Sequence, residues 1–214
     1  MVTQPAQAPH TELDRKLTII RDDLLRLGNR IDTAIDQAIT ALLNHDRGLA
    51  SAVIESDELI NQRRYQLEEA CLVTIALQQP VATDLRRLIA TMHAAGELER
   101  MGDHAAGIAN IVLKLDAAAQ LPLSNFERMA EAVRRMLRSS LYAFAYDDVQ
   151  QASRLPILDD KIDEFYQQNM RNLLTYMLED STVVAEATYL LWVSHNLERL
   201  GDRSVNLSER TLRR

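Results

Sequence analysis

The chain of 214 residues contains an internal repeat, and this repeat limits its possible folds more than any other feature of the sequence. The pattern Glu-Arg-apolar-Gly-Asp occurs in GELERMGDHAAGIAN, residues 96–110, and again 99 positions later in HNLERLGDRSVNLSE, residues 195–209. Upstream of this pattern, a shift of 102 positions brings residues of the first half onto counterparts in the second half. The matched pairs are Ile31 and Val133, Ile35 and Leu137, Ile39 and Leu141, Leu42 and Phe144, Asp46 and Asp148, Asp57 and Asp159, and Ile60 and Ile162. We therefore expect two copies of one unit, each about 100 residues long.

Apolar residues recur at helical spacing through both copies, and few residues interrupt them. The chain has only 6 Gly and 5 Pro, so long helices are favoured over a strand-rich fold. Prolines and candidate N-cap residues divide the pattern into six expected helices, at about 11–44, 48–78, 82–117, 125–152, 157–178 and 182–212.

Helices of about 30 residues are roughly 45 Å long, and short loops between them require antiparallel packing. The sequence therefore predicts an all-α fold of two tandem antiparallel three-helix bundles. The first bundle is expected at residues 11–118 and the second at 124–212, after a disordered tail at 1–10. Because the linker at 121–124 is short, the two bundles are expected to pack on each other.

Composition and charge exclude several classes of protein. The net charge of −7 argues against a nucleic-acid-binding protein, which needs a basic surface to meet phosphates. The single cysteine excludes a disulfide framework within the chain and a zinc site made of thiolates. The start of the chain, MVTQPAQAPH, lacks the basic and apolar regions of a secretory signal, and no apolar run reaches the ~20 residues that span a bilayer. We expect a cytoplasmic protein without direct membrane insertion.

The repeated pattern places two carboxylates on one face of a helix in each copy. Glu99 and Asp103 are four positions apart in the sequence, as are Glu198 and Asp202, so each pair shares a face. The neighbouring apolar residues project from the opposite side, which leaves the carboxylates facing solvent, the other bundle or another subunit. Like charges at this spacing cost about 0.2–0.5 kcal/mol, and a glycine within a helix costs about 1 kcal/mol more. One interpretation is that the four carboxylates hold a multivalent cation.

A second interpretation remains open at this stage. Arg100 and Arg199 each precede the aspartate of the pattern by three residues, so each copy could form a simple surface salt bridge. The glycines could serve only to let two helices touch. The Glu-x-x-His pair of di-iron bundle enzymes is absent, which gives little support to a redox or hydrolytic enzyme.

Other conspicuous side chains have ordinary structural interpretations. We expect Met92 and Trp192 in the core, because both occur at helical spacing. The arginine pairs at 86–87 and 134–135 are expected on solvated helix faces, with docking to an acidic partner as the alternative. His93 and His104 are expected to be exposed or hydrogen-bonded and not to bind metal.

Three segments, QQPVATDLRRLIA, LERMGDHAAGI and NLERLGDRSVNLSE, resemble the PhoU family of bacterial phosphate-signalling and phosphate-transport accessory proteins. The resemblance covers about residues 12–212, and the doubled E-x-x-x-D motif on the third helix of each bundle is quite specific to the family. This chain departs from the family pattern at Gly107, where Asn is usual, and at Arg203, where His is common.

The resemblance implies a function that spacing alone does not. Members of the family repress the phosphate-starvation response by coupling the ATPase of a phosphate ABC transporter to a sensor histidine kinase, and they are not known as enzymes. The resemblance implies a cytoplasmic homodimer without an organic cofactor, with iron or zinc held by Glu99, Asp103, Glu198 and Asp202. The alternative is a metal-binding helical-bundle protein, either a metal store or a metal-dependent enzyme.

Overall fold

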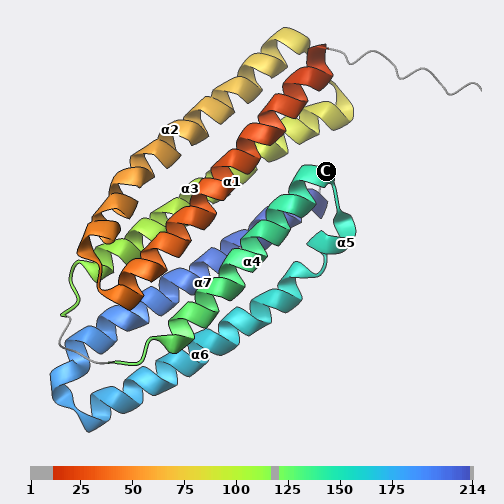
Figure 1. Cartoon of the computed structure of the whole chain (residues 1–214). Helices are drawn as coiled ribbons and strands as arrows, with labels where there is room; N and C mark the ends of the chain where they lie inside the picture. Colours follow the sequence, from red (N-terminus) through yellow and green to blue (C-terminus); the bar gives the residue numbers. More distant parts are fainter. Residues whose placement is uncertain (1–11, 117–120, 213–214) are drawn as a thin grey trace, which may run out of the picture.

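The computed structural model describes residues 12–116 and 121–212, and Figure 1 shows the helices of these residues side by side. The elements are α1 (Glu12–Asn44), α2 (Arg47–Gln78), α3 (Ala82–Val112), α4 (Ser124–Tyr146), α5 (Val149–Ala152), α6 (Leu155–Glu179), a 3₁₀ turn η1 (Ser181–Val183) and α7 (Val184–Leu212). No strand occurs among the described residues, and the prediction of an all-α fold with two three-helix bundles is confirmed. The tail expected at 1–10 lies outside the described residues.

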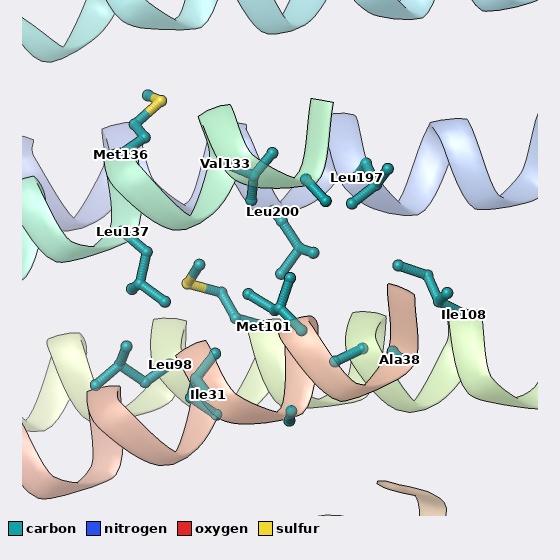
Figure 2. Close-up of a cluster of buried hydrophobic side chains, with 14 of the residues drawn as sticks. Ile31, Ala38, Leu98, Met101, Ile108, Val133, Met136, Leu137, Leu197 and Leu200 are labelled. Carbon is teal, nitrogen blue, oxygen red and sulfur yellow. The ribbon is translucent and has the colours of Figure 1, made fainter. Parts of the chain in front are cut away.

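The two bundles share one hydrophobic core. Helices α1, α2 and α3 form the first bundle, and α4, α6 and α7 form the second. Helices α1 and α3 pack on α4 and α7 across the middle of the molecule, while α2 and α6 lie on opposite outer sides (Figure 1). In Figure 2, Ile31 and Met101 of the first bundle meet Leu137 and Leu200 of the second. The predicted packing of the bundles on each other is therefore confirmed.

The repeat is visible in the connections between helices. His45 and Asp147 both adopt positive φ, 50° and 56°, and each ends the first helix of its unit. The next residue caps the following helix in each copy: Asp46 accepts a hydrogen bond from the amide of Leu49, and Asp148 accepts one from that of Gln151. The expectation that the fourth helix continues to 152 is wrong, because the left-handed backbone at Asp147 ends α4 and the short α5 follows.

Ion pairs join the two bundles along α1 and α4. The Arg134 guanidinium binds Asp32 through two bonds, Nε to Oδ1 at 3.0 Å and Nη2 to Oδ2 at 3.1 Å, and it also pairs with Asp36. Arg87 reaches Asp147 of the second unit at 3.2 Å. The prediction that Arg134 is a solvated side chain is wrong, because the packing of α1 on α4 leaves it only 23% exposed beside these carboxylates.

A second polar seam joins α3 and α7 with approximate two-fold symmetry. On one side of the seam, the buried Glu97 accepts hydrogen bonds from Arg203 at 3.3 Å and from Asn206 at 3.4 Å. On the other side, the equivalent positions carry Asn196, His104 and Gly107, and Nδ1 of His104 lies 3.0 Å from Oδ1 of Asn196. A Cβ added at Gly107 would lie 3.1 Å from the same Asn196 oxygen. Asn196 therefore occupies the space that an asparagine at 107 would need.

The two predicted core side chains have different outcomes. Met92 is partly buried and packs against the core. Trp192 is 60% exposed, so its prediction is wrong: it projects from the outer side of α7, next to the buried Val193.

His104 is hydrogen-bonded and His93 is exposed, as expected. None of the helices in residues 12–116 and 121–212 is long and apolar enough to cross a membrane.

Candidate functional site

The first acidic face lies where α2 packs against α3. It consists of Asp57 from α2 together with Glu99 and Asp103 from α3. Gly102 of α3 lies directly against α2, because a Cβ built there would be 3.1 Å from both the Asp57 Oδ1 and the Ile60 Cγ2. The glycine therefore lets the two helices approach closely, which brings a carboxylate of α2 beside those of α3.

The second acidic face repeats this arrangement between α6 and α7 with one more carboxylate. It consists of Asp159, Asp163, Glu198 and Asp202. A Cβ at Gly201 would lie 2.9 Å from Asp159 Oδ1 and 3.0 Å from Ile162 Cδ1, closer than at Gly102. The interpretation that the glycines let two helices touch is confirmed, and this contact is also what assembles each acidic face.

Burial and neighbouring negative charge disturb one carboxyl group of the first face, that of Asp57. The pKa of Asp57 is raised, first by burial and then by the negative charges of Asp103 and Glu99. Its Oδ1 atom is buried and has no hydrogen-bond partner among the described residues, while Oδ2 receives a long contact of 3.5 Å from the amide of Asn61. The first face therefore contains one carboxylate oxygen with no compensating donor.

The second face is more strongly disturbed. Burial, followed by the charges of Asp163, Asp202 and Glu198, raises the pKa of Asp159 to about 6. The pKa values of Asp163 and Glu198 are also raised, in both cases mainly by burial and then by Asp202. The Glu198 Oε2 atom is buried; His195 Nδ1 lies 3.5 Å away, but in the described structure this oxygen accepts no hydrogen bond. Burial, together with repulsion between neighbouring carboxylates, thus destabilises the ionised forms of Asp159, Asp163 and Glu198.

The salt-bridge interpretation is confirmed in one copy and wrong in the other. Arg199 pairs with Asp202 at 2.6 Å, within the second face. Arg100 does not pair with Asp103, because it turns toward the buried Glu97 and binds it at 3.0 Å. A salt bridge therefore accounts for part of the second face and for none of the first.

The donor set of both faces suits a hard or borderline divalent cation. All the converging groups are carboxylates, which bind Mg²⁺, Mn²⁺ and iron well, and each face holds a buried oxygen that lacks a donor. Within the described part of the chain, however, no three His, Cys, Asp or Glu side chains are arranged to hold one ion. The chemistry of the residues fits a cation, and no coordination geometry is assigned.

The sequence analysis named Glu99, Asp103, Glu198 and Asp202, and it missed the carboxylates on the partner helices. The structure brings each named pair together with Asp57 or Asp159. The signal for these was present in the repeat, since Asp57 and Asp159 are matched positions and are followed three residues later by the matched Ile60 and Ile162. The sequence alone does not show that this stripe of α2 and α6 packs against the repeated glycine.

Comparisons with known proteins agree over nearly the whole chain. The family model described as the PhoU domain matches residues 24–112 and again residues 126–211. A phosphate-specific transport system accessory protein PhoU homolog from Pseudomonas putida is 36% identical over 200 residues, which cover 92% of this chain and 78% of that protein. The accessory protein PhoU of Escherichia coli K12 is 35% identical over 199 residues, 92% of this chain and 83% of that protein.

Two solved structures are also similar. The crystal structure of PhoU from Pseudomonas aeruginosa superposes with a TM-score of 0.88 at 30% identity, covering 94% of this chain and 97% of that one. The structure of the phosphate transport system regulatory protein PhoU from Streptococcus pneumoniae gives a TM-score of 0.88 at 31% identity, covering 94% and 95%.

Proposed function

The chain belongs to the PhoU family, and from this premise we propose that it is a regulatory accessory protein of a phosphate transport system. The observation that carries the proposal is the agreement of both repeats with the family, together with similarity to relatives named as accessory proteins of phosphate-specific transport. One similar solved structure is itself described as a regulatory protein of phosphate transport. These names give no support to the alternative of a metal store or metal-dependent enzyme.

In the finer form of the proposal, the chain works in the cytoplasm as a homodimeric adaptor. It contacts the ATPase of a phosphate ABC transporter and a sensor histidine kinase, and it holds the kinase inactive while phosphate is plentiful. The role requires binding surfaces and no catalytic step by this chain.

The proposal is tested by deleting the gene in its host, in a background without a second copy of the family. We expect phosphatase expression in high phosphate to rise in the deletion strain and to return to its repressed level when the chain is supplied from a plasmid. Continued repression in the deletion strain would overturn the regulatory role. Pull-down of the ATPase and of the kinase by the purified chain tests the two partners separately.

We also propose that the two acidic faces bind divalent cations. The observation that supports this is the convergence of carboxylates with raised pKa values, Asp57 in the first face and Asp159, Asp163 and Glu198 in the second. Nearby positive charge would relieve the repulsion and give the buried oxygens a partner. Iron and zinc are the ions that the resemblance implies, and Mn²⁺ also suits an all-oxygen donor set.

The metal proposal is tested on protein freed of metal with EDTA. Titration with Mn²⁺, Fe²⁺ or Zn²⁺ is expected to raise the melting temperature, because an ion that binds only the folded state stabilises it. Asp159→Asn should weaken this response at the second face, while Glu127→Gln, an exposed carboxyl on α4, should leave it unchanged. The absence of a thermal shift with all three ions would overturn the proposal. It would also be overturned if Asp159→Asn and Asp57→Asn both gave the same thermal shift as wild type.

A further inference from the structure

A cleft of about 750 Å³ opens between α1 and α2 of the first bundle, separate from the acidic carboxylates described above. Its volume lies within the roughly 300–1,000 Å³ that small-molecule sites occupy in proteins. The floor is apolar and is formed by buried side chains of both helices. These floor residues are Leu27, Ala34, Ile60 and Leu67.

The rim of the cleft is basic, although the chain as a whole carries a net charge of −7. Three arginines line it, Arg26, Arg30 and Arg63, together with one acidic residue, Asp23. Arg26 is neutralised by Asp23 at 2.6 Å. Arg63 donates to the side-chain oxygen of Gln66 at 3.0 Å, and neither Arg63 nor Arg30 has a carboxylate partner among the described residues. Two guanidinium groups at the mouth therefore lack a counter-ion.

Side chains with amide and hydroxyl groups complete the rim. They are Asn29, Thr33, Gln37, Ser56 and Gln66. Such groups hydrogen-bond the edges of polar rings and sugars, while guanidinium groups bind phosphates through paired N–H donors. The cleft thus combines an apolar floor, neutral polar walls and two guanidinium groups at its mouth.

The second repeat provides an internal comparison, because the shift of 102 positions places each lining residue on a counterpart. Ala34 corresponds to the larger Met136, and Arg63 corresponds to the apolar Phe165; both Met136 and Phe165 pack in the second bundle. Met136 is fully buried and, in Figure 2, points away from the first bundle, opposite to its neighbour Leu137. The Arg128 guanidinium lies over the Phe165 ring at 5.2 Å.

The same comparison shows that the positive charge of the cleft is absent from the second repeat. Arg30 corresponds to the buried Ala132, and Arg63 to Phe165, so neither guanidinium without a counter-ion has a basic counterpart. Arg135 replaces Thr33 but is exposed on the outside of the filled bundle. A small cavity of about 60 Å³ lies between α4 and α6, and its lining includes Asn125 and Asn169, the counterparts of Asp23 and Leu67. The first repeat therefore differs from its own copy in both features that an anionic ligand would need.

From these observations we propose that the α1–α2 cleft binds a nucleotide, with its phosphates at Arg30 and Arg63 and its base and sugar between the apolar floor and the polar walls. A nucleotide is favoured over free phosphate because the cleft is far larger than a phosphate ion and has a buried apolar floor. This inference is independent of the proposed adaptor role, and its test uses binding by the isolated full chain.

The test is calorimetric titration of the full chain with ADP, ATP, GDP and GTP in the presence of EDTA, which prevents binding through a metal at the acidic faces. We expect at least one of the four to bind, and adenosine or guanosine and pyrophosphate, each of which lacks half of the ligand, to bind at least about tenfold more weakly. No binding of any of the four at millimolar concentration would overturn the proposal.

Two variants and a control assign the binding to the cleft. Ala34→Met with Arg63→Phe places the side chains of the second repeat in the first, and it should abolish binding. Arg30→Gln with Arg63→Gln keeps the space and removes the charge, and it should weaken binding at least about tenfold. Arg171→Gln, an exposed arginine on α6, should bind like wild type. Circular dichroism and melting temperature confirm that each variant is folded, and unchanged affinity in both cleft variants would overturn the proposal.

Discussion

The two acidic faces are built on matching helix pairs, and they differ at one central position. In the first face that position is Asn61, whose amide lies 3.5 Å from Asp57. In the second face it is Asp163, which adds a negative charge and is the first charged neighbour that raises the pKa of Asp159. The difference shows that the repeat keeps the framework of glycine, isoleucine and aspartate, while the number of carboxyl groups in each face depends on a single side chain.

At the α3–α7 seam, too, the two repeats share the helix packing but differ in their side chains. Its two halves are related by the repeat, but one half is a buried charged cluster around Glu97 and the other is a neutral pair of His104 and Asn196. Gly107, which departs from the usual Asn of the family, lies where Asn196 already fills the space. Gly107 is therefore explained by the Asn196 side chain of the facing helix and not by the acidic face.

The contact made by the glycines is expected to give the largest difference from wild type. Gly201→Val should lower the free energy of unfolding by about 1–3 kcal/mol, because the added carbons meet Asp159 and Ile162 and push α6 away from α7. Gly102→Val should have a smaller effect, since its nearest neighbours are 3.1 Å away and not 2.9 Å. Urea denaturation measures both. A larger effect at Gly102 would contradict the view that the second face is the more tightly packed one.

Neutralising Asp159 should have the next largest effect on the free energy of unfolding, and this effect should have the opposite sign. The folded-state pKa of Asp159, about 6, exceeds its ordinary value of 3.8, so the folded protein loses stability as the pH rises through this interval. Asp159→Asn should therefore be more stable than wild type above pH 7, by on the order of 1 kcal/mol after allowing for solvent screening of a partly exposed group. The gain should disappear near pH 4.

Thermal unfolding across pH 4 to 8 in EDTA checks this prediction, and Asp57→Asn is the matched variant in the first face. Its gain should have the same sign and a smaller size, because fewer negative charges surround Asp57. A loss of stability in Asp159→Asn at neutral pH would show that this carboxylate makes a stabilising contact instead of experiencing repulsion.

An exchange at the differing position should convert one face toward the other. Asp163→Asn should lower the pKa of Asp159, and Asn61→Asp should raise the pKa of Asp57 further, because each change removes or adds one neighbouring charge. Carboxyl titration by NMR measures both values. The expected change in stability is only a few tenths of a kcal/mol. If the two exchanges leave the titrations unaltered, the difference between the faces has another cause.

The sequence was sufficient to predict the fold because each copy of the repeat shows the same helical spacing of apolar residues, so each helix is indicated twice. Ile31 and its counterpart Val133, for example, are both buried where the bundles meet. From the sequence, only one of the two helices in each acidic face could be predicted. The i, i+4 rule relates residues within one helix, and it does not tell which stripe of α2 or α6 packs against that helix. Trp192 was misplaced for a related reason: periodicity identifies a face, and only tertiary packing determines whether that face is covered.

The arginine beside each pair of carboxylates should distinguish the faces by the smallest margin. Arg199 pairs with Asp202, and its positive charge offsets part of the rise that burial and Asp202 cause in the pKa of Glu198. Arg199→Gln should therefore raise the pKa of Glu198 further and cost at most about 0.5 kcal/mol of stability. Arg100→Gln should leave the titration of Asp57 unchanged, because Arg100 binds Glu97 and is directed toward the α3–α7 seam. NMR titration of the carboxyl groups in both variants measures this difference. If Arg100→Gln raises the pKa of Asp57 as much as Arg199→Gln raises that of Glu198, then Arg100 serves the first face in solution, and the two copies are more alike than their side-chain contacts indicate.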